Sequence, residues 1–354
     1  MNEVIIIYAV TLLLAWPLGK YIAGVFNGAR GTAGAVFLQV ENGLYRLFGV
    51  NPSQPMSWQG YGKALLKLHL MLVLIVFGLL MAQGFLFLNP DNIDGMSWDL
   101  ALHTAISFLT NTNQQHYSGQ AQLSYLAHTF GIVTLQVVTP AAGMAALVAI
   151  VRTLLGRADE KKQPSGEGAV SVGNFYEDIT RAIVRVMLPV AAVVALIIAS
   201  QGVPNSYEGA RTAIPLDQTS GMEEQNIPIG PVAPMIAIKQ VGTNGGGWYG
   251  PNSSVPLENP TPVSNFVQTV SIVLIPAALV FALGFMTGRR RLAMVVMGVM
   301  VVMSVSLTSV AIWSENQPNA AFSGLAAEGP NLEGKEVRFG ATATALWGSW
   351  TTQT

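Results

Sequence analysis

Two short stretches of the chain combine threonine, asparagine and glycine in a way that suits the binding of a bare cation. They are Thr110-Asn111-Thr112-Asn113 and Gly242-Thr243-Asn244-Gly245-Gly246-Gly247, and each follows a short, mildly apolar segment that lies between two long apolar runs. A loop of small residues held at membrane depth inside protein can present its backbone carbonyls in place of the water around an ion. Glycine permits the dihedral angles that such a loop needs. The two stretches therefore predict that the protein handles a cation.

Each stretch taken alone also fits a plain alternative. The first has no glycine until Gly119, and a glycine triplet such as the one in the second is common in flexible turns. Three nearby side chains, Gln115, His116 and Glu258, can either line the mouth of an ion filter or hold the loops by hydrogen bonds. The sequence leaves both roles open for each of them.

The composition is that of a membrane protein. Of the 354 residues, 51% are hydrophobic and only 10% are charged, against about 25% charged in an average soluble domain. Spanning a bilayer takes about 20 mostly apolar residues. Six segments qualify: 4–26, 64–88, 127–155, 182–202, 266–288 and 292–313. The first could be mistaken for a secretory signal, but it has Glu3 in place of a basic start and Lys20 on its far side, so we expect a retained helix.

The basic residues predict which side of the membrane each loop faces. If the N-terminus is outside, the inner side holds all but four of the 18 Lys and Arg residues, the exceptions being Arg211, Lys239, Lys335 and Arg338. The positive-inside rule favours this orientation, which places both Asn/Thr/Gly loops on the outer side. Twelve of the 19 acidic residues also fall outside. They either concentrate cations at the outer mouth or simply keep the surface solvated.

The order of segments repeats along the chain, which is typical of transporters. The fold class that we predict is an all-α polytopic membrane protein, built from repeats of a membrane helix, a re-entrant pore helix, a filter loop and a second membrane helix. The expected pore helices cover 97–109, 232–241 and 340–350. The expected domains are an N-terminal membrane helix at 1–26, an interfacial segment at 27–62, pore repeat 1 at 63–155, an inner linker at 156–181, pore repeat 2 at 182–288 and an incomplete repeat 3 at 289–354. Residues 40–48 suit an interfacial helix, and 203–231 an extended outer loop.

Enzyme chemistry finds no support in these residues. The chain has no cysteine, four scattered histidines without metal-ligand spacing, and no nucleotide-binding or hydrolase motif. Any ATP-driven step must therefore take place in another subunit. The run Arg289-Arg290-Arg291 is read as a topology anchor, with a lipid or partner contact as the alternative.

The chain resembles a known family, the potassium-binding A subunit of bacterial Kdp potassium-transporting ATPases. The resemblance rests on LNP (88–90), SWDLALHTA (97–105), SFLTNTN (107–113), YSG (117–119), GTNGGG (242–247), NSS (252–254), PLENPT (256–261) and EGKEVRFG (333–340). It implies four pseudo-symmetric repeats around one pore in the bacterial cytoplasmic (inner) membrane, each giving one filter strand. The first two strands carry over onto 110–113 and 242–247, and Thr351 and Thr352 match the opening of the third.

The resemblance also implies the ligand and the partners. The ion is K+, and ATP with Mg2+ would act only through a P-type catalytic ATPase subunit. A C-type accessory subunit and a small accessory membrane subunit complete the implied complex, which lies in the lipid bilayer and binds no nucleic acid. Gln114 departs from the family, in which an aromatic residue is expected. The sequence ends within the expected third strand, so we expect a truncated or partial form of the subunit.

Two other functions stay open on the residues. A passive or ion-coupled potassium transporter would use the same repeat, although PLENPT favours the ATPase subunit. A non-conducting membrane scaffold would use the glycines only for close helix packing.

Overall fold

The structure is a computed structural model that describes residues 2–28, 34–155, 171–217, 219, 221–318 and 331–353. The chain forms two compact units, one made of Val25–Ser264 and the other of Met1–Gly24 with Asn265–Thr354. The two predicted filter loops, 110–113 and 242–247, both belong to the first.

Among the residues that the structure describes, six helices are long and apolar enough to cross a membrane, which agrees with the predicted number. Four of them are α1 (Asn2–Phe26), α3 (Trp58–Ala82, continued by the 3-10 turn η1, Gln83–Phe85), α10 (Pro262–Thr287) and α11 (Arg290–Glu315). The other two contain π-helical segments: η2 (Ala127–Ile132) leads into α6 (Val133–Leu154), and α7 (Phe175–Arg181) continues through η3 (Ala182–Met187) into α8 (Leu188–Ser200).

The fourth membrane helix starts earlier than the sequence indicates. We expected a linker over 156–181, but α7 begins at Phe175, while 156–170 lie outside the described residues. The cause is local. The Asn174 side chain accepts hydrogen bonds from the backbone N–H groups of Tyr176 and Glu177, at 2.9 and 3.2 Å, which caps the helix.

Three shorter helices lie where the pore helices were predicted: α4 (Trp98–Leu109), α9 (Val232–Val241) and α12 (Gly340–Thr351). The predicted interfacial helix is α2 (Gly34–Leu47), which starts six residues before residue 40. A single turn of helix, α5 (Gly119–Gln122), follows the first filter loop.

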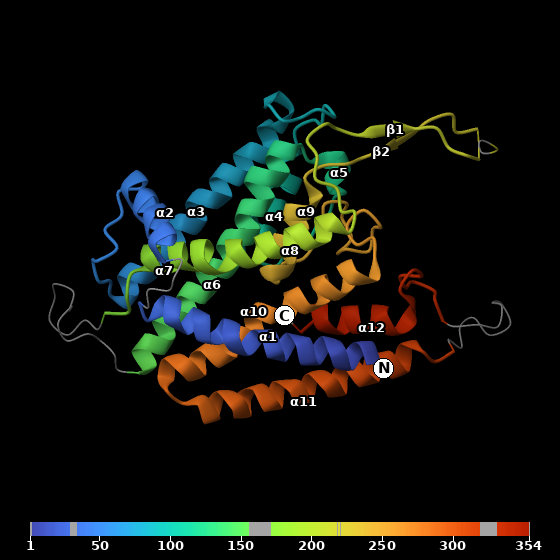
Figure 1. Ribbon diagram of the computed structural model, residues 1–354. Coiled ribbons are helices and arrows are strands. Elements are labelled where there is room, and N and C mark those ends of the chain that lie inside the picture. The colour runs from blue at the N-terminus through green and yellow to red at the C-terminus, as the bar shows by residue number, and fades with distance from the viewer. Residues whose placement is uncertain are drawn as a thin grey trace. The chain divides into compact units, whose positions relative to one another are not determined.

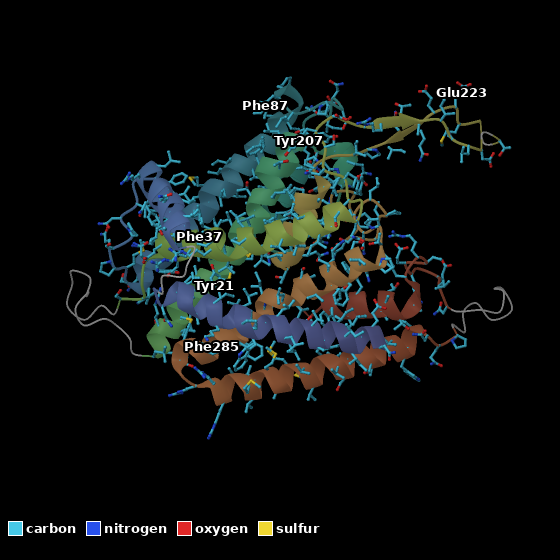
Figure 2. The ribbon with its side chains drawn as sticks, in the orientation of Figure 1. Tyr21, Phe37, Phe87, Tyr207, Glu223 and Phe285 are labelled. Carbon is cyan, nitrogen blue, oxygen red and sulfur yellow. The ribbon has the colours of Figure 1, made fainter. Side chains whose placement is uncertain are left out.

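The predicted outer loop 203–231 contains a hairpin that the sequence analysis missed. Its strands β1 (Arg211–Ala213) and β2 (Gln225–Ile227) pair antiparallel, with Arg211 opposite Ile227. Figure 1 draws them as two yellow arrows, and Figure 2 labels Glu223 beside them. Strands of three residues give little sequence signal.

In the unit Val25–Ser264, α6 packs against α4, α7 and α9, while α3 packs on α4 and α8 on α9. Buried ion pairs link several of these helices. Arg152 of α6 makes a two-pronged contact with Asp178 of α7 at 2.6 and 2.9 Å, and the Tyr61 hydroxyl of α3 donates to the same carboxylate at 3.1 Å. Arg185 likewise pairs with Glu41 of α2. These pairs connect the helices around the two predicted filter loops.

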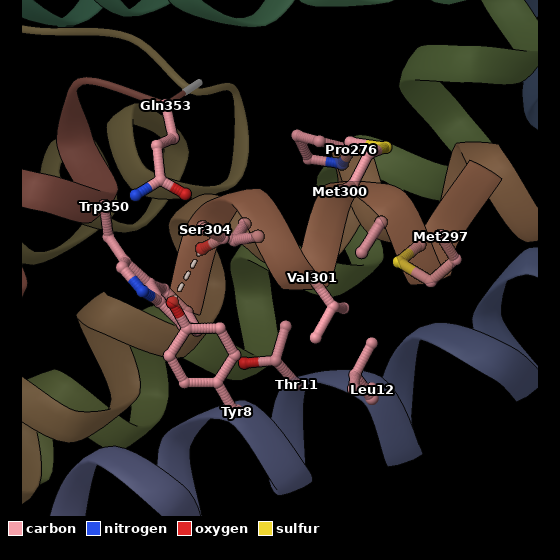
Figure 3. A pocket seen from close by; sticks show the side chains of 12 residues that line it. Tyr8, Thr11, Leu12, Pro276, Met297, Met300, Val301, Ser304, Trp350 and Gln353 are labelled. Carbon is pink, nitrogen blue, oxygen red and sulfur yellow. Dashed lines mark hydrogen bonds between the residues drawn. The ribbon is translucent and has the colours of Figure 1, made fainter. Parts of the chain in front are cut away.

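The second unit packs α1, α10, α11 and α12 on one another. The Cα atom of Gly19 lies against α10, where an added Cβ would be 2.7 Å from the Phe281 Cβ. Trp16 makes edge contacts with Phe281 and with Phe285, which Figure 2 labels. The Tyr8 hydroxyl hydrogen-bonds Ser304 at 2.6 Å beside a mostly apolar pocket of about 90 Å³, shown in Figure 3.

Candidate ion-binding site

Both predicted filter loops leave the helices that precede them with the same geometry. The first residue after α4 is Thr110, with φ −88° and ψ 5°, and the first after α9 is Gly242, with φ −84° and ψ 0°. The next residues, Asn111 and Thr243, have φ values of 59° and 55°. Position 110 therefore corresponds to 242. At these two positions the loops have the same backbone conformation, as the predicted repeat requires.

The hydrogen bonds that close the two helices also match. The N–H groups of Thr112 and Asn113 both donate to the Ser107 carbonyl at 3.0 Å, and the N–H of Asn244 donates to the Lys239 carbonyl at 2.9 Å. In both cases, a carbonyl in the last turn of the helix thus accepts a hydrogen bond from the N–H group of the residue five positions later. The C-terminal end of a helix carries partial negative charge, so each loop begins where a cation is stabilised.

Left-handed backbone conformations recur in both loops. They occur at Asn111 and Asn113 in the first, and at Thr243 and Gly246 in the second, where φ is 72°. Asparagine tolerates this region, but a β-branched residue such as threonine does so only under strain, and strain of this kind clusters at functional sites. In a regular strand, successive residues face opposite sides. The left-handed residues break that alternation, as an array of carbonyls facing an ion requires.

The two loops are hydrogen-bonded to each other at both ends. Next to the helices, the Asn244 side-chain amide donates a hydrogen bond to the Asn111 Oδ1 atom. The same oxygen accepts a hydrogen bond from the Thr139 hydroxyl of α6 at 3.1 Å. At the other end, Gln115 Nε2 donates to the Gly247 carbonyl at 3.1 Å, and the Gly247 N–H donates to Gln115 Oε1 at 3.0 Å. These bonds fix the spacing between the two loops.

A proline inside α6 explains why the second loop starts with glycine. Pro140 has no N–H, so the Gln136 carbonyl one turn earlier lacks its helical partner. That carbonyl lies against Gly242, where an added Cβ would be 2.8 Å from the oxygen and 3.0 Å from the Pro140 Cγ atom. The Gln136 side chain is fully buried, and neither of its polar atoms has a hydrogen-bond partner in the described structure. Only glycine fits at this approach.

Glu258 does not face solvent, because its side chain is fully buried. The carboxylate accepts hydrogen bonds from the backbone N–H groups of Tyr249 and Ser253, both at 2.9 Å. Of the two roles that the sequence left open, this geometry is that of a residue that holds the loop. Burial raises the pKa of the Glu258 carboxyl, while the neighbouring Lys239 and the backbone donors act in the opposite direction.

Lys239 is a site residue that sequence reasoning missed. It was counted as an outer-loop base, whereas the structure places it in the last turn of α9 with a fully buried side chain. Its Nζ atom lies 3.8 Å from Glu258 Oε2, and burial lowers the pKa of the amine to about 8. The one available signal was a lysine in an otherwise apolar short helix.

The histidines lie around the loops and not within them. His116 is exposed and makes an edge contact with His103, with ring centroids 4.6 Å apart. His128 is buried and stacks on Trp248, with centroids 3.8 Å apart. Among the described residues there is no group of three or more His, Asp or Glu side chains that could hold a metal ion.

The proposed opening of a third strand lies in the other unit, and its local geometry repeats that of the first two. Thr351 is the last residue of α12, and Thr352 follows with φ −91° and ψ −7°, close to the values at Thr110 and Gly242. The hydroxyl groups of both residues donate back to helix carbonyls, Thr351 to Trp347 at 2.9 Å and Thr352 to Gly348 at 3.0 Å.

Comparison with known proteins identifies the family of the chain. A family model described as "Potassium-transporting ATPase A subunit" matches residues 5–354. Three similar proteins carry the name "Potassium-transporting ATPase potassium-binding subunit". The Pseudomonas putida protein is 42% identical over 346 residues, covering 98% of this chain and 59% of its own. The Pseudomonas aeruginosa protein is 40% identical over 355 residues, covering 99% and 60%.

The third, from Desulfovibrio desulfuricans, is 38% identical over 356 residues, covering 96% of this chain and 59% of its own. The chain thus spans about three fifths of the length of these relatives. Together with the six membrane-length helices, the match is that of a multi-pass membrane protein.

Proposed function

The chain belongs to the potassium-transporting ATPase A subunit family, and from that premise we propose that it binds K+ in a selectivity filter and passes the ion to an ATPase subunit of an import complex. The filter strands are Thr110-Asn111-Thr112-Asn113 and Gly242-Thr243-Asn244-Gly245-Gly246-Gly247. Thr351 and Thr352 open a third. Gln115 lies at the mouth, and Glu258 holds the second strand from behind.

One observation carries the proposal. Two helices end beside loops whose first two residues have the same backbone conformation, and those loops are cross-linked by Asn111 with Asn244 and by Gln115 with Gly247. Helix C-termini favour a cation, and uncharged carbonyls replace water without trapping the ion as a carboxylate would. Potassium is the ion that the names of the relatives give.

The chemistry that drives transport lies outside this chain. The sequence contains no motif for nucleotide binding or phosphorylation. We therefore assign ATP hydrolysis, with its Mg2+, to a Kdp-type catalytic subunit, which assembles with a C-type accessory subunit and a small accessory membrane subunit. The names of the relatives, which include the word ATPase, support such a partner.

We place the protein in the bacterial cytoplasmic membrane with its N-terminus outside. The distribution of Lys and Arg supports this orientation. Both filter strands then receive K+ from the outer side, where most of the acidic residues lie.

The test is potassium uptake by a Gly246→Asp variant made at the chromosomal gene, so that the natural partners are present. Gly246 has a left-handed backbone, and an added side chain would meet Gln115 Oε1. We expect the half-saturation concentration for K+ to rise at least about tenfold. The matched control is Gly221→Asp. Gly221 has a similar φ of 75°, but no atom lies within 4 Å of its added Cβ.

Three outcomes bear on the proposal. Unchanged K+ affinity and unchanged K+ over Na+ selectivity in Gly246→Asp would contradict the filter assignment. Co-purification of the wild type without any ATPase would favour a passive or ion-coupled transporter. Failure of the wild type to bind K+ would favour a non-conducting scaffold.

A further inference from the structure

Two oppositely charged side chains are fully buried beside the proposed second filter strand. Lys239 and Glu258 both have no exposed side-chain surface. Taking a charge out of water is costly unless it is paired and hydrogen-bonded, and an apolar pair of similar volume often gives a more stable protein. A stability role alone therefore does not explain why these charges are present.

Lys239 holds both ends of the segment that contains the strand. Its main-chain carbonyl receives the Asn244 N–H at 2.9 Å, at the start of the strand. Its Nζ atom donates to Asn252 Oδ1 at 2.8 Å and to the Ser253 hydroxyl at 2.6 Å, just beyond the end of the strand. One residue thus connects the beginning of the strand with the turn that follows it.

Glu258 closes the same segment from the other side. Besides receiving the Tyr249 and Ser253 N–H groups, the carboxylate lies against the last glycine of the strand. An added Cβ at Gly247 would be 2.5 Å from Glu258 Oε1. The negative charge is therefore in contact with the backbone that the ion would meet.

The first repeat performs the same task without charge. The residue equivalent to Lys239 is Ser107, since each provides the carbonyl that receives the loop N–H five residues on. The Ser107 hydroxyl receives the Gln114 N–H at 2.7 Å and donates to the Gln114 carbonyl at 3.1 Å. The first loop is therefore held in place by a neutral side chain, whereas the second is held by a pair of charged side chains.

We propose that Lys239 and Glu258 are positioning residues that set the ion selectivity of the filter: they fix the 242–247 strand, and Lys239 cancels the field of the Glu258 carboxylate at the ion. This inference rests on the proposed filter. The choice between K+ and Na+ depends on the field strength of the coordinating groups as well as on the size of the site. An uncompensated carboxylate strengthens the field and favours the smaller ion, whereas an uncompensated ammonium group repels every cation.

The two single substitutions are therefore expected to have opposite effects. Lys239→Met leaves any ionised Glu258 carboxylate uncompensated, so Na+ should inhibit K+ uptake more strongly than in the wild type, by up to about tenfold. Glu258→Gln leaves the ammonium group uncompensated, so the half-saturation concentration for K+ should rise about tenfold with the K+ over Na+ preference retained. The double variant restores neutrality and should recover most of the wild-type preference.

The measurement is uptake of K+ with and without Na+, in cells that carry each variant at the chromosomal gene, at equal amounts of membrane-inserted protein. Glu208→Gln is the matched control, because Glu208 is also ion-paired, with Arg211, but is 67% exposed. It should behave as the wild type. The proposed function is tested separately, by comparing K+ uptake in wild-type cells with uptake in cells that lack the gene.

Opposite shifts in the two single variants with recovery in the double variant support the inference. Unchanged Na+ inhibition and K+ affinity in both single variants overturn it, and so does a common loss of transport rate at unchanged selectivity. If neither single variant accumulates in the membrane, the same uptake measurement on Asn252→Ala tests the inference. This substitution removes one hydrogen-bond acceptor of Lys239 without changing any charge. A weaker shift in the direction of Lys239→Met supports the inference, and no shift contradicts it.

Discussion

The side-chain amide of Asn244 donates a hydrogen bond to the Asn111 side-chain oxygen, across 133 positions of sequence. The two residues follow two different helix C-termini. The bond therefore joins the starts of two loops that the chain builds independently. The spacing of the proposed filter depends on this contact together with the Gln115–Gly247 pair.

A double-mutant cycle measures how strongly the two loops depend on this bond. We expect Asn111→Ala and Asn244→Ala each to raise the half-saturation concentration for K+, and the double variant to be no worse than the poorer single one. A coupling of about 1 kcal/mol, roughly fivefold in concentration, corresponds to one hydrogen bond. Strictly additive effects would mean that the contact does not operate in the working protein.

The close approach of Gly242 to Gln136 and Pro140 of α6 leads to a stability prediction. Gly242→Ala places a Cβ against the Gln136 carbonyl and Pro140. We therefore expect the free energy of unfolding of the purified protein in detergent to fall by about 1–3 kcal/mol, and its melting temperature to fall with it. The control is Gly143→Ala in α6, where nothing lies within 4 Å and alanine favours the helix. Equal melting temperatures for the two variants would contradict the packing described here.

The buried amine of Lys239 predicts a pH dependence. Its pKa in the folded protein is about 8, below the 10.5 of a free lysine side chain. The protonated amine therefore destabilises the fold, fully below about pH 8 and less as the pH rises towards 10.5. The charged group that faces it is Glu258, with Tyr249 beside that carboxylate.

Above pH 8, loss of the Lys239 proton leaves the Glu258 carboxylate uncompensated. We expect Na+ to inhibit K+ uptake more strongly at pH 9 than at pH 7. The Lys239→Arg variant serves as control, because a guanidinium group stays protonated throughout this range. A wild-type profile as flat as that of Lys239→Arg would show that Lys239 does not titrate between these values.

The ion pair between Arg152 and Asp178 should matter for stability and not for ion choice. Asp178 has no exposed side-chain surface, so Arg152→Met leaves a buried charge and should lower the free energy of unfolding by about 3–5 kcal/mol. Arg211→Met removes an ion pair that is about two-thirds exposed, and should change it by about 0–1 kcal/mol. Thermal unfolding of both variants in detergent checks the difference, and similar losses would contradict it.

The sequence predicted the features that depend on neighbouring residues. Long apolar runs identify the membrane helices, and the Thr/Asn/Gly content identifies the two loops. The capping side chain of Asn174, which moves a helix start to Phe175, is a local signal that was overlooked.

Contacts between distant residues could not be predicted in the same way. Nothing near Lys239 in the sequence indicates that Asn252, Ser253 and Glu258 surround its amine. Likewise, the stacking of His128 on Trp248 joins residues from different repeats, and no periodicity reports it. The sequence thus indicated the two proposed filter loops, whereas the contacts that hold them in place are seen only in the structure.

The most direct test of the central claim is to locate the ion. The protein, purified from its native membrane with its partners and supplied with Tl+ in place of K+, should show anomalous scattering between 110–113 and 242–247, in contact with backbone oxygens of both strands. The Gly246→Asp variant should lose that signal. A wild-type structure with Tl+ bound elsewhere and none between the two strands would contradict the account.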